Sequence, residues 1–103
     1  MSNIIYHIVP PDYWQQFSEK EIYTAPTFEE EGFIHCCTKE QIEYVLTTYF
    51  VGIKAVLLMK IDTAALDAEL KVELANGQHF PHIYGGINKQ AIIGIQKIEN
   101  HVT

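Results

Sequence analysis

Hydrophobic residues recur along this chain in patterns that predict several strands and one long helix. The run 4–9 is apolar on both faces and is followed by two prolines, which indicates a buried strand. Thr38 and Gln41 have the spacing of a capping box that precedes an amphipathic segment. In that segment the apolar residues fall at helical spacing: Ile42, Val45, Leu46, Tyr49 and Phe50. We therefore expect the longest helix here.

Further strands are predicted in the remaining sequence. The run from Lys54 to Ile61 is continuously apolar at its centre and is expected to be a central strand. Residues 70–74 alternate apolar with charged side chains, which is typical of a half-buried strand. Residues 33–37 and 91–98 are two more strand candidates, and residues 79–86 form a stiff, aromatic segment that ends in two glycines.

Short helices and turns join these strands. Asp12 and Asp62 are placed to cap short helices, and an acidic turn over residues 27–31 is expected to end at Gly32. The Asn76-Gly77 pair predicts a tight turn. Because strands outnumber long helices and the connections are mixed, the expected fold class is α+β rather than a doubly wound sheet.

Length and composition support one globular domain over residues 1–103. The chain is 48% hydrophobic and 19% charged, which is typical of a folded protein rather than a disordered one. A chain of this size buries roughly two-thirds of the surface that it exposes when unfolded. No second core is expected.

The charges argue against nucleic acids and membranes as partners. The net charge is −6, and all seven cations are lysines because the sequence contains no arginine. Nucleic-acid binding relies on a basic patch, and planar guanidinium groups are the usual clamps for phosphate. We therefore expect a small-molecule ligand, no nucleic acid, no membrane contact, and a monomer or homodimer.

The cysteines and the apolar segments indicate a cytoplasmic protein. Cys36 and Cys37 are adjacent, and adjacent cysteines in an extended segment point to opposite faces and rarely bond to each other. We expect no signal peptide and no membrane span, because no apolar run approaches about 18 residues. A reduced, cytoplasmic protein fits both observations.

Four histidines carry the clearest chemical interest. His7, His35, His79 and His82 lie in or beside segments built of large apolar residues. A neutral imidazole in such surroundings needs partners for both ring nitrogens, and its near-neutral pKa makes it useful as an acid, a base or a ligand donor. Each one alone can be explained as a hydrogen-bonded core or rim histidine. The four together indicate a small-molecule site.

A transition-metal site is an alternative for the same residues. His35, Cys37, His79 and His82 are acceptable zinc ligands, but the paired spacings of zinc motifs are missing. A nucleophilic cysteine paired with a histidine is a further option. Cys36 is more simply explained as a small buried hydrophobic residue.

Glu73 and two tyrosines complete the candidate site. Glu73 lies on the charged face of the alternating segment, where it either points to solvent or faces a cleft and stabilises a cationic transition state. Tyr23 and Tyr84 lie in loop-like segments and can form an aromatic wall for a planar ligand. The acidic run 29–31 is expected to be a solvated helix edge.

Several short motifs resemble one bacterial family over nearly the whole chain. They are Ile5-Tyr6-His7-Ile8, Glu31-Gly32-Phe33-Ile34-His35-Cys36, Gln41, Glu73 and Phe80-Pro81-His82-Ile83-Tyr84-Gly85. In order and spacing they resemble domain-of-unknown-function family 952 (DUF952). The resemblance implies an ADP-ribosyltransferase-like fold, in which a split mixed sheet surrounds a cleft beside one long and several short helices.

The resemblance also implies roles for the candidate residues, because distant relatives with that fold bind NAD in the cleft. By analogy His7 would contact the ribose, and Tyr23 or Tyr84 would stack on nicotinamide. Glu73 would steer the reaction, and His35 resembles a histidine of the RNA 2′-phosphotransferase branch. The implied catalytic residues are thus Glu73 and His35, and the implied ligand-binding residues are His7, His82, Tyr84 and Tyr23.

The sequence departs from that superfamily in two ways. Ile8 stands where a glycine commonly follows the first histidine and lets the dinucleotide lie close. The arginines on which the phosphotransferase branch relies are absent.

The leading hypothesis is a histidine-lined pocket that binds NAD or a related nucleotide, acts at the ribosyl carbon and requires no other cofactor. The activity would be of the ADP-ribosyltransferase or NAD-glycohydrolase type. The alternatives are a non-catalytic nucleotide- or metabolite-binding module and a metal-dependent hydrolase. Glu73 inside the cleft would favour the enzyme, and three converging imidazole or thiolate groups would favour the hydrolase.

Overall fold

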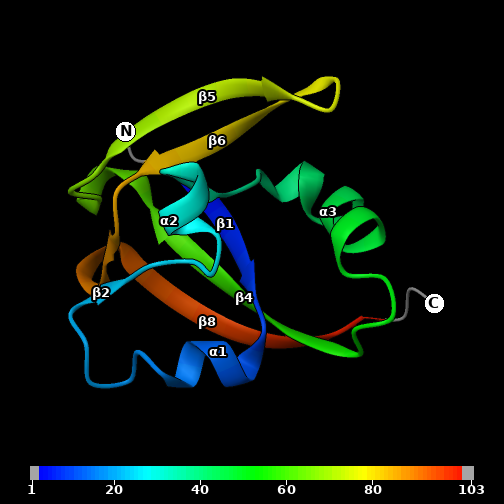
Figure 1. The fold of residues 1–103 in the computed structure, drawn as a ribbon, viewed down its shortest axis with the longest axis horizontal. Helices are drawn as coiled ribbons and strands as arrows, with labels where there is room; N and C mark the ends of the chain where they lie inside the picture. The colour runs from blue at the N-terminus through cyan, green and yellow to red at the C-terminus, as the bar shows by residue number, and fades with distance from the viewer. Residues whose placement is uncertain (1–2, 101–103) are drawn as a thin grey trace.

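The computed structural model describes residues 3–100, which form an α+β domain of strands and short helices (Figure 1). The strands are β1 (Ile4–Val9), β2 (Ile22–Tyr23), β3 (Ile34–His35), β4 (Ala55–Asp62), β5 (Glu69–Ala75), β6 (Gln78–Tyr84), β7 (Ile87–Asn88) and β8 (Ile92–Glu99). The helices are α1 (Pro11–Gln15), α2 (Phe28–Glu31) and α3 (Ile42–Tyr49), with 3₁₀ turns at Lys39–Gln41, Thr63–Ala65 and Lys89–Ala91.

The strands form two three-stranded sheets and one two-stranded ribbon. Their orders are β1-β4-β8, β3-β6-β5 and β2-β7. Every named strand pair in residues 3–100 is antiparallel, so the α+β class is confirmed and the expected mixed sheet is wrong. In Figure 1 the β5–β6 hairpin lies on one side and the β1-β4-β8 sheet on the other, with α2 and α3 between them.

The largest departure from the sequence pattern is β6, which is a central strand although Pro81 lies in its middle. The turn before it has positive φ at Asn76 (52°) and Gly77 (81°), as a two-residue type I′ hairpin requires. In such a hairpin the pair next to the turn is hydrogen-bonded and the pairs then alternate. Val72 and Pro81 therefore form a non-hydrogen-bonded pair. Because such a pair exchanges no backbone hydrogen bonds, the β5–β6 ladder loses none through the missing N–H of Pro81.

Pro81 instead ends the ladder on the other side of β6. Its carbonyl accepts the N–H of Cys36 at 3.0 Å, but Pro81 has no N–H to donate in return. Strand β3 accordingly ends at His35, and the chain leaves toward the other sheet. There Cys37 and Tyr6 exchange two backbone hydrogen bonds, of 2.7 and 2.8 Å, which join β1 to the end of β3.

The buried imidazole of His7 also links β1 to the end of β3, through a side-chain hydrogen bond. Nδ1 lies 2.7 Å from the carbonyl oxygen of His35, which can only accept, so Nδ1 carries the proton and donates it. Nε2 lies 2.8 Å from the hydroxyl of Tyr23 and accepts from it. Burial lowers the pKa of His7 to about 4, so the imidazole is neutral at physiological pH.

The core is built around Tyr23, which is fully buried. Its ring contacts the rings of Tyr13, Trp14 and Phe17, with centroids 5.0 to 6.0 Å apart. These rings bring α1 and the following turn against β2. The aliphatic part of the core lies between the sheets and includes Val9, Ile34, Met59, Ile61, Ile83 and Ile87.

A close backbone approach explains one of the two glycines that follow β6. A Cβ built on Gly86 would lie 2.2 Å from Cγ2 of Ile22 and 3.3 Å from the carbonyl oxygen of Tyr23. Glycine at this position therefore lets the chain pass directly against β2.

We expect Gly86→Ala to destabilise the protein by about 1 to 3 kcal/mol, because the added methyl group must displace the branched side chain of Ile22. Gly94→Ala is the matched control, since its Cβ would lie an ordinary 3.7 Å from that of Lys60. Urea unfolding of both variants measures the difference. Equal stabilities would show that the close approach at Gly86 does not constrain the fold.

We also expect acid to destabilise the fold through His7. Between about pH 6.5 and pH 4, His7 is protonated in the unfolded chain but stays neutral in the folded chain. The free energy of unfolding therefore falls as the pH is lowered through this range. The difference between the two pKa values corresponds to about 3 kcal/mol. His7→Gln keeps a neutral donor and acceptor and should lose about that much less between pH 7 and pH 4 in urea unfolding. Parallel pH profiles for the two proteins would contradict this account.

Candidate functional site

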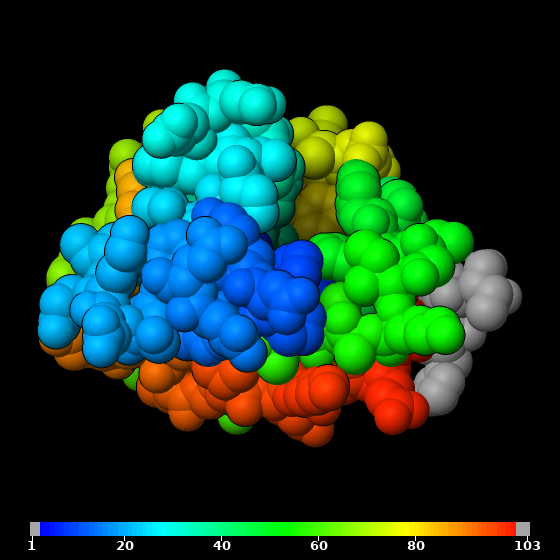
Figure 2. All heavy atoms as spheres, turned by 60° about the horizontal axis from the view of Figure 1, so that its bottom comes forward, coloured from blue at the N-terminus to red at the C-terminus, as the bar shows by residue number. Residues whose placement is uncertain are grey.

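A pocket of about 590 Å³ opens between α2, α3, β1 and the tip of the β5–β6 hairpin. Figure 2 shows it as a hollow between the cyan α2 region, the blue N-terminal region and the green α3 region, with the yellow hairpin behind. Its volume lies within the range of roughly 300 to 1,000 Å³ that is usual for small-molecule sites. The lining comprises Tyr6, His7, Ile8, Pro10, Ala25, Pro26, Thr27, Glu31, His35, Cys36, Cys37, Val45, Tyr49, Phe50, Ala75, Asn76 and Phe80.

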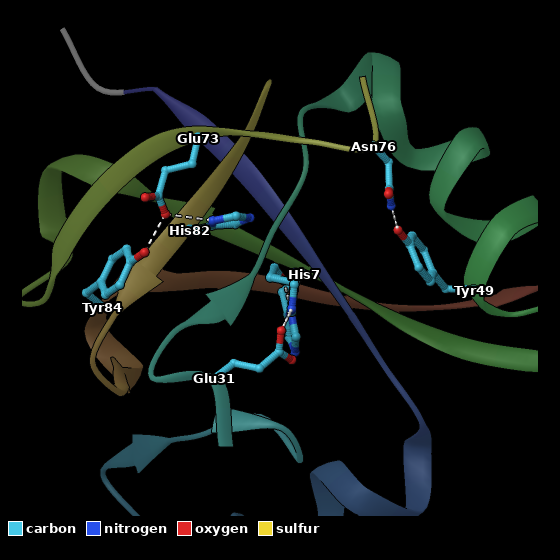
Figure 3. A network of polar contacts seen from close by, with 8 residues as sticks. His7, Glu31, Tyr49, Glu73, Asn76, His82 and Tyr84 are labelled. Carbon is cyan, nitrogen blue, oxygen red and sulfur yellow. Dashed lines mark hydrogen bonds and ion pairs between the residues drawn. The ribbon is translucent and has the colours of Figure 1, made fainter. Parts of the chain in front are cut away.

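Side-chain hydrogen bonds hold the α3 wall against the hairpin wall. The amide of Asn76, at the hairpin tip, donates to the hydroxyl of Tyr49 on α3 (Figure 3). Gln41 accepts the backbone N–H of Thr38 at 3.0 Å, which confirms the expected capping box, and donates to the carbonyl of His79 at 2.9 Å. The cap that starts the helix therefore also ties it to β6.

The charged feature of the pocket is a carboxylate–imidazole pair. Nε2 of His35 donates to Oε2 of Glu31 at 2.9 Å, and this bond holds the pKa of Glu31 below its ordinary value. Both side chains reach water, with 53% of His35 and 38% of Glu31 exposed. The lining residues include no lysine, so the formal charge of the pocket wall, with histidines counted as neutral, is negative.

A second polar cluster lies beside the pocket on β5 and β6. One carboxylate oxygen of Glu73 accepts the hydroxyl of Tyr84 at 2.5 Å and Nδ1–H of His82 at 2.8 Å (Figure 3). These bonds, that of Tyr84 first, lower the pKa of Glu73, and the carboxylate in turn raises the pKa of Tyr84. His82 is 4% exposed and stacks on Phe33 at 4.2 Å, and its Nε2 has no partner within residues 3–100.

The cluster and the pocket share one face of the β3-β6-β5 sheet. Across the strands His82 is opposite His35, and Glu73 is opposite Phe80. Opposite residues lie on the same face, so all four point the same way. His35 and Phe80 line the pocket, whereas His82 and Glu73 do not. The rings of His35 and His82 lie 5.3 Å apart, so His35 joins the two groups.

The six residues predicted for the site are linked by contacts, but they do not line one cavity. Only His7 and His35 line the pocket. Tyr23 has no exposed surface, so the structure corrects its expected role as a stacking ring. Both ring nitrogens of His7 are already bonded within the protein, as described above. The ring of Tyr84 is covered by the ammonium group of Lys71 at 4.9 Å.

The position of Glu73 bears on the choice between enzyme and binding module. The enzyme hypothesis needs this carboxylate inside the cleft, but Glu73 lies outside the pocket lining and is bonded to its own neighbours. The hydrolase alternative needs three converging ligands. Residues 3–100 contain no group of three or more histidine, cysteine or acidic side chains that could hold a metal ion.

The two cysteines are buried and are not bonded to each other. Burial raises the pKa of Cys37 to about 12 and raises that of Cys36 well above its ordinary value. A thiol with so little thiolate at neutral pH is a poor nucleophile. The structure therefore supports the simpler interpretation of Cys36 as a small buried hydrophobic residue.

Sequence reasoning missed several residues of the pocket. Glu31 was assigned to a solvated helix edge with its neighbours, yet it lies in the pocket wall. Its spacing of four residues from His35 was the available signal, although α2 ends between them. Asn76 was interpreted only as a turn residue, and Tyr49 only as part of the helix.

No helix within residues 3–100 has the length and apolar character that are needed to span a membrane.

Comparisons with known proteins show a family and a fold. The chain is similar to protein CC0527 from Caulobacter crescentus, whose crystal structure gives a TM-score of 0.79 at 22% identity over 94% of this chain and 85% of that one. Its solution NMR structure gives 0.78 at 22% identity over 93% and 84%. These likenesses show the fold alone. No curated protein matches the sequence. The family model described as "Protein of unknown function (DUF952)" matches residues 8–95, so the chain belongs to this family.

Proposed function

We propose that this protein binds a small molecule that combines an apolar or aromatic part with a cationic or hydrogen-bond-donating group, in the pocket between α2, α3, β1 and the β5–β6 hairpin. The observation that carries the proposal is the pairing of Glu31 with His35 in the wall of a cavity large enough for such a ligand. Ligand sites commonly combine an apolar lining with a few polar groups that fix orientation. The apolar part of this wall includes Ile8, Pro26, Val45, Phe50 and Phe80.

The charge of the wall favours a cationic or hydrogen-bond-donating ligand. Glu31 is ionised at neutral pH, and its side chain accepts hydrogen bonds from His35, through Oε2, and from Thr27. A carboxylate has about four acceptor positions on its two oxygens. An ammonium, a ring cation or an amide N–H of a ligand would therefore find an acceptor here.

The negative charge of the wall also limits which part of a nucleotide such as NAD the pocket can bind. The two phosphates of NAD would lie against a wall that holds a carboxylate and no lysine. Nicotinamide riboside keeps the cationic ring and the ribose of NAD but has no phosphate. If the ligand belongs to the NAD group, the fit to this pocket is best for that part of the molecule.

The location of Glu73 favours binding over catalysis. A carboxylate that stabilises a developing positive charge has to face the reacting atoms. Here Glu73 is held by His82 and Tyr84 outside the pocket lining. We therefore propose a binding protein, with chemistry at the ribosyl carbon as the second candidate on the sequence resemblance alone.

The test is a thermal-shift and titration series with nicotinamide riboside, nicotinamide, NAD and ADP-ribose. We expect nicotinamide riboside to bind more tightly than NAD, and ADP-ribose not to bind, because the latter carries phosphates but no cation. Glu31→Gln should weaken the binding of nicotinamide riboside by about 10- to 100-fold, as the loss of a charged hydrogen bond implies. Glu29→Gln is the matched control, because Glu29 lies on the same short helix but outside the pocket lining.

Two results would contradict the proposal. ADP-ribose binding as tightly as nicotinamide riboside would show that the charge of the wall does not select the ligand. NMR shift changes centred on Glu73, His82 and Tyr84, with none at Glu31 or Asn76, would place the ligand elsewhere. If none of the four compounds binds, a panel of apolar amines tests the proposed ligand class without the NAD analogy.

A further inference from the structure

The outer edge of β5 has an unusual surface for a strand that ends a sheet. β5 is the last strand in the order β3-β6-β5, so its outer backbone groups have no partner strand within residues 3–100. Val72 and Leu74 are 63% and 67% exposed, the highest values among the large apolar residues described. The expected burial of the apolar face is therefore wrong for these two residues. An open strand edge that exposes large apolar side chains can pair with another strand.

The hairpin geometry fixes which backbone groups point outward. The pair next to the turn, Ala75 and Gln78, is the hydrogen-bonded pair of a two-residue hairpin, and hydrogen-bonded pairs then recur every second residue. Residues 69, 71, 73 and 75 thus direct their N–H and C=O groups to β6. Residues 70, 72 and 74 direct theirs to the open edge.

We propose that two copies of this chain pair through β5, antiparallel and centred on Val72, to form a continuous six-stranded sheet. In this register Val72 faces the partner's Val72, and Leu70 faces the partner's Leu74. These are the residues whose backbone groups point outward, so each facing pair can exchange both hydrogen bonds. Between them Lys71 faces the partner's Glu73 twice, once on each side of the two-fold axis.

Charge complementarity selects this register over its neighbours. Sliding the partner by two residues in one direction places Lys71 against the partner's Lys71. Sliding it by two in the other direction places Glu73 against the partner's Glu73. Like charges directly opposite each other destabilise a strand pair, whereas opposite charges stabilise it. A slide of one residue would set outward backbone groups against inward ones.

The apolar side of β5 gives the pairing its favourable burial. Leu70 already packs against the core of its own subunit. In the proposed dimer the exposed side chains of Val72 and Leu74 would meet the same residues and Leu70 of the second copy. The result is one apolar strip across the new sheet, on the face opposite the Glu73–His82–Tyr84 cluster.

Cysteine cross-linking tests the register directly. Val72→Cys should form a disulfide-linked dimer under mild oxidation, because the two copies of residue 72 face each other. Leu74→Cys is the matched control, equally exposed and on the same strand face. Its two copies would be offset by four residues, about 13 Å along the strands, which is beyond disulfide reach. The two native cysteines are buried in the wild-type chain, so we expect them not to compete in the cross-linking. Equal cross-linking at the two positions, or none at Val72→Cys, would overturn the proposal.

Charge reversal gives an independent test by sedimentation equilibrium. Lys71→Glu places two glutamates opposite each other and should weaken the dimer by about tenfold or more. Glu73→Lys should weaken its own dimer in the same way, and mixing the two variants should restore dimers because every facing pair is then opposite in charge. Circular dichroism checks that Glu73→Lys, which loses the bonds to His82 and Tyr84, is folded. A wild-type protein that stays monomeric at the highest concentration reached, or a mixture no tighter than the single variants, would overturn the pairing.

Discussion

The structure depends on one buried, neutral imidazole. His7 donates to the carbonyl of His35 and accepts from the hydroxyl of Tyr23, so it ties β1 to the end of β3 and to the aromatic part of the core. The backbone bonds between Tyr6 and Cys37 lie next to it and reinforce the same junction. Because this junction fixes the backbone of His35, it also sets where the His35 side chain meets Glu31 in the pocket wall. The residue that the resemblance assigned to ribose binding is thus the one that positions another histidine.

Much of the fold could be predicted from local pattern, and the failures have identifiable causes. The strand over residues 4–9, the capping box before α3 and the Asn76-Gly77 turn are all present, because each depends on a few neighbouring residues. β6 was not recognised as a strand because Pro81 argues against a central position. Pro81 is tolerated for two reasons. On the β5 side it belongs to a non-hydrogen-bonded pair, as the position of the turn dictates, and on the other side β3 ends where the N–H of residue 81 would be needed. Only the register reveals that both conditions hold.

The site was less predictable than the fold because its residues meet across long sequence distances. The histidines were identified from their polar character in apolar segments. Their roles, however, depend on which groups each imidazole contacts in the fold, and the sequence does not show those contacts. Both ring nitrogens of His7 are hydrogen-bonded to protein groups, and the side chain of His35 is exposed to solvent. Nε2 of His82 has no hydrogen-bond partner among the described residues. Glu31 was not predicted as a site residue because acidic side chains in the first turn of a helix are already explained by their favourable interaction with the helix dipole. The pocket walls come from α2, α3 and the hairpin, whose packing no single motif encodes.

The placement of β5 shows how the polar site and the free edge are connected. On its polar face Glu73 accepts bonds from His82 and Tyr84, while on its apolar face Leu70 packs against the core and Val72 and Leu74 are exposed to solvent. The apolar face of an alternating strand usually covers the core along its whole length, whereas here Leu70 does so and Val72 and Leu74 do not. The strand is held by its ladder with β6 and by the carboxylate, so burial of Val72 and Leu74 is not needed to place it. In the proposed dimer a second copy buries the apolar surface that the subunit leaves exposed, and Lys71 and Glu73 of the polar face select the register of that contact.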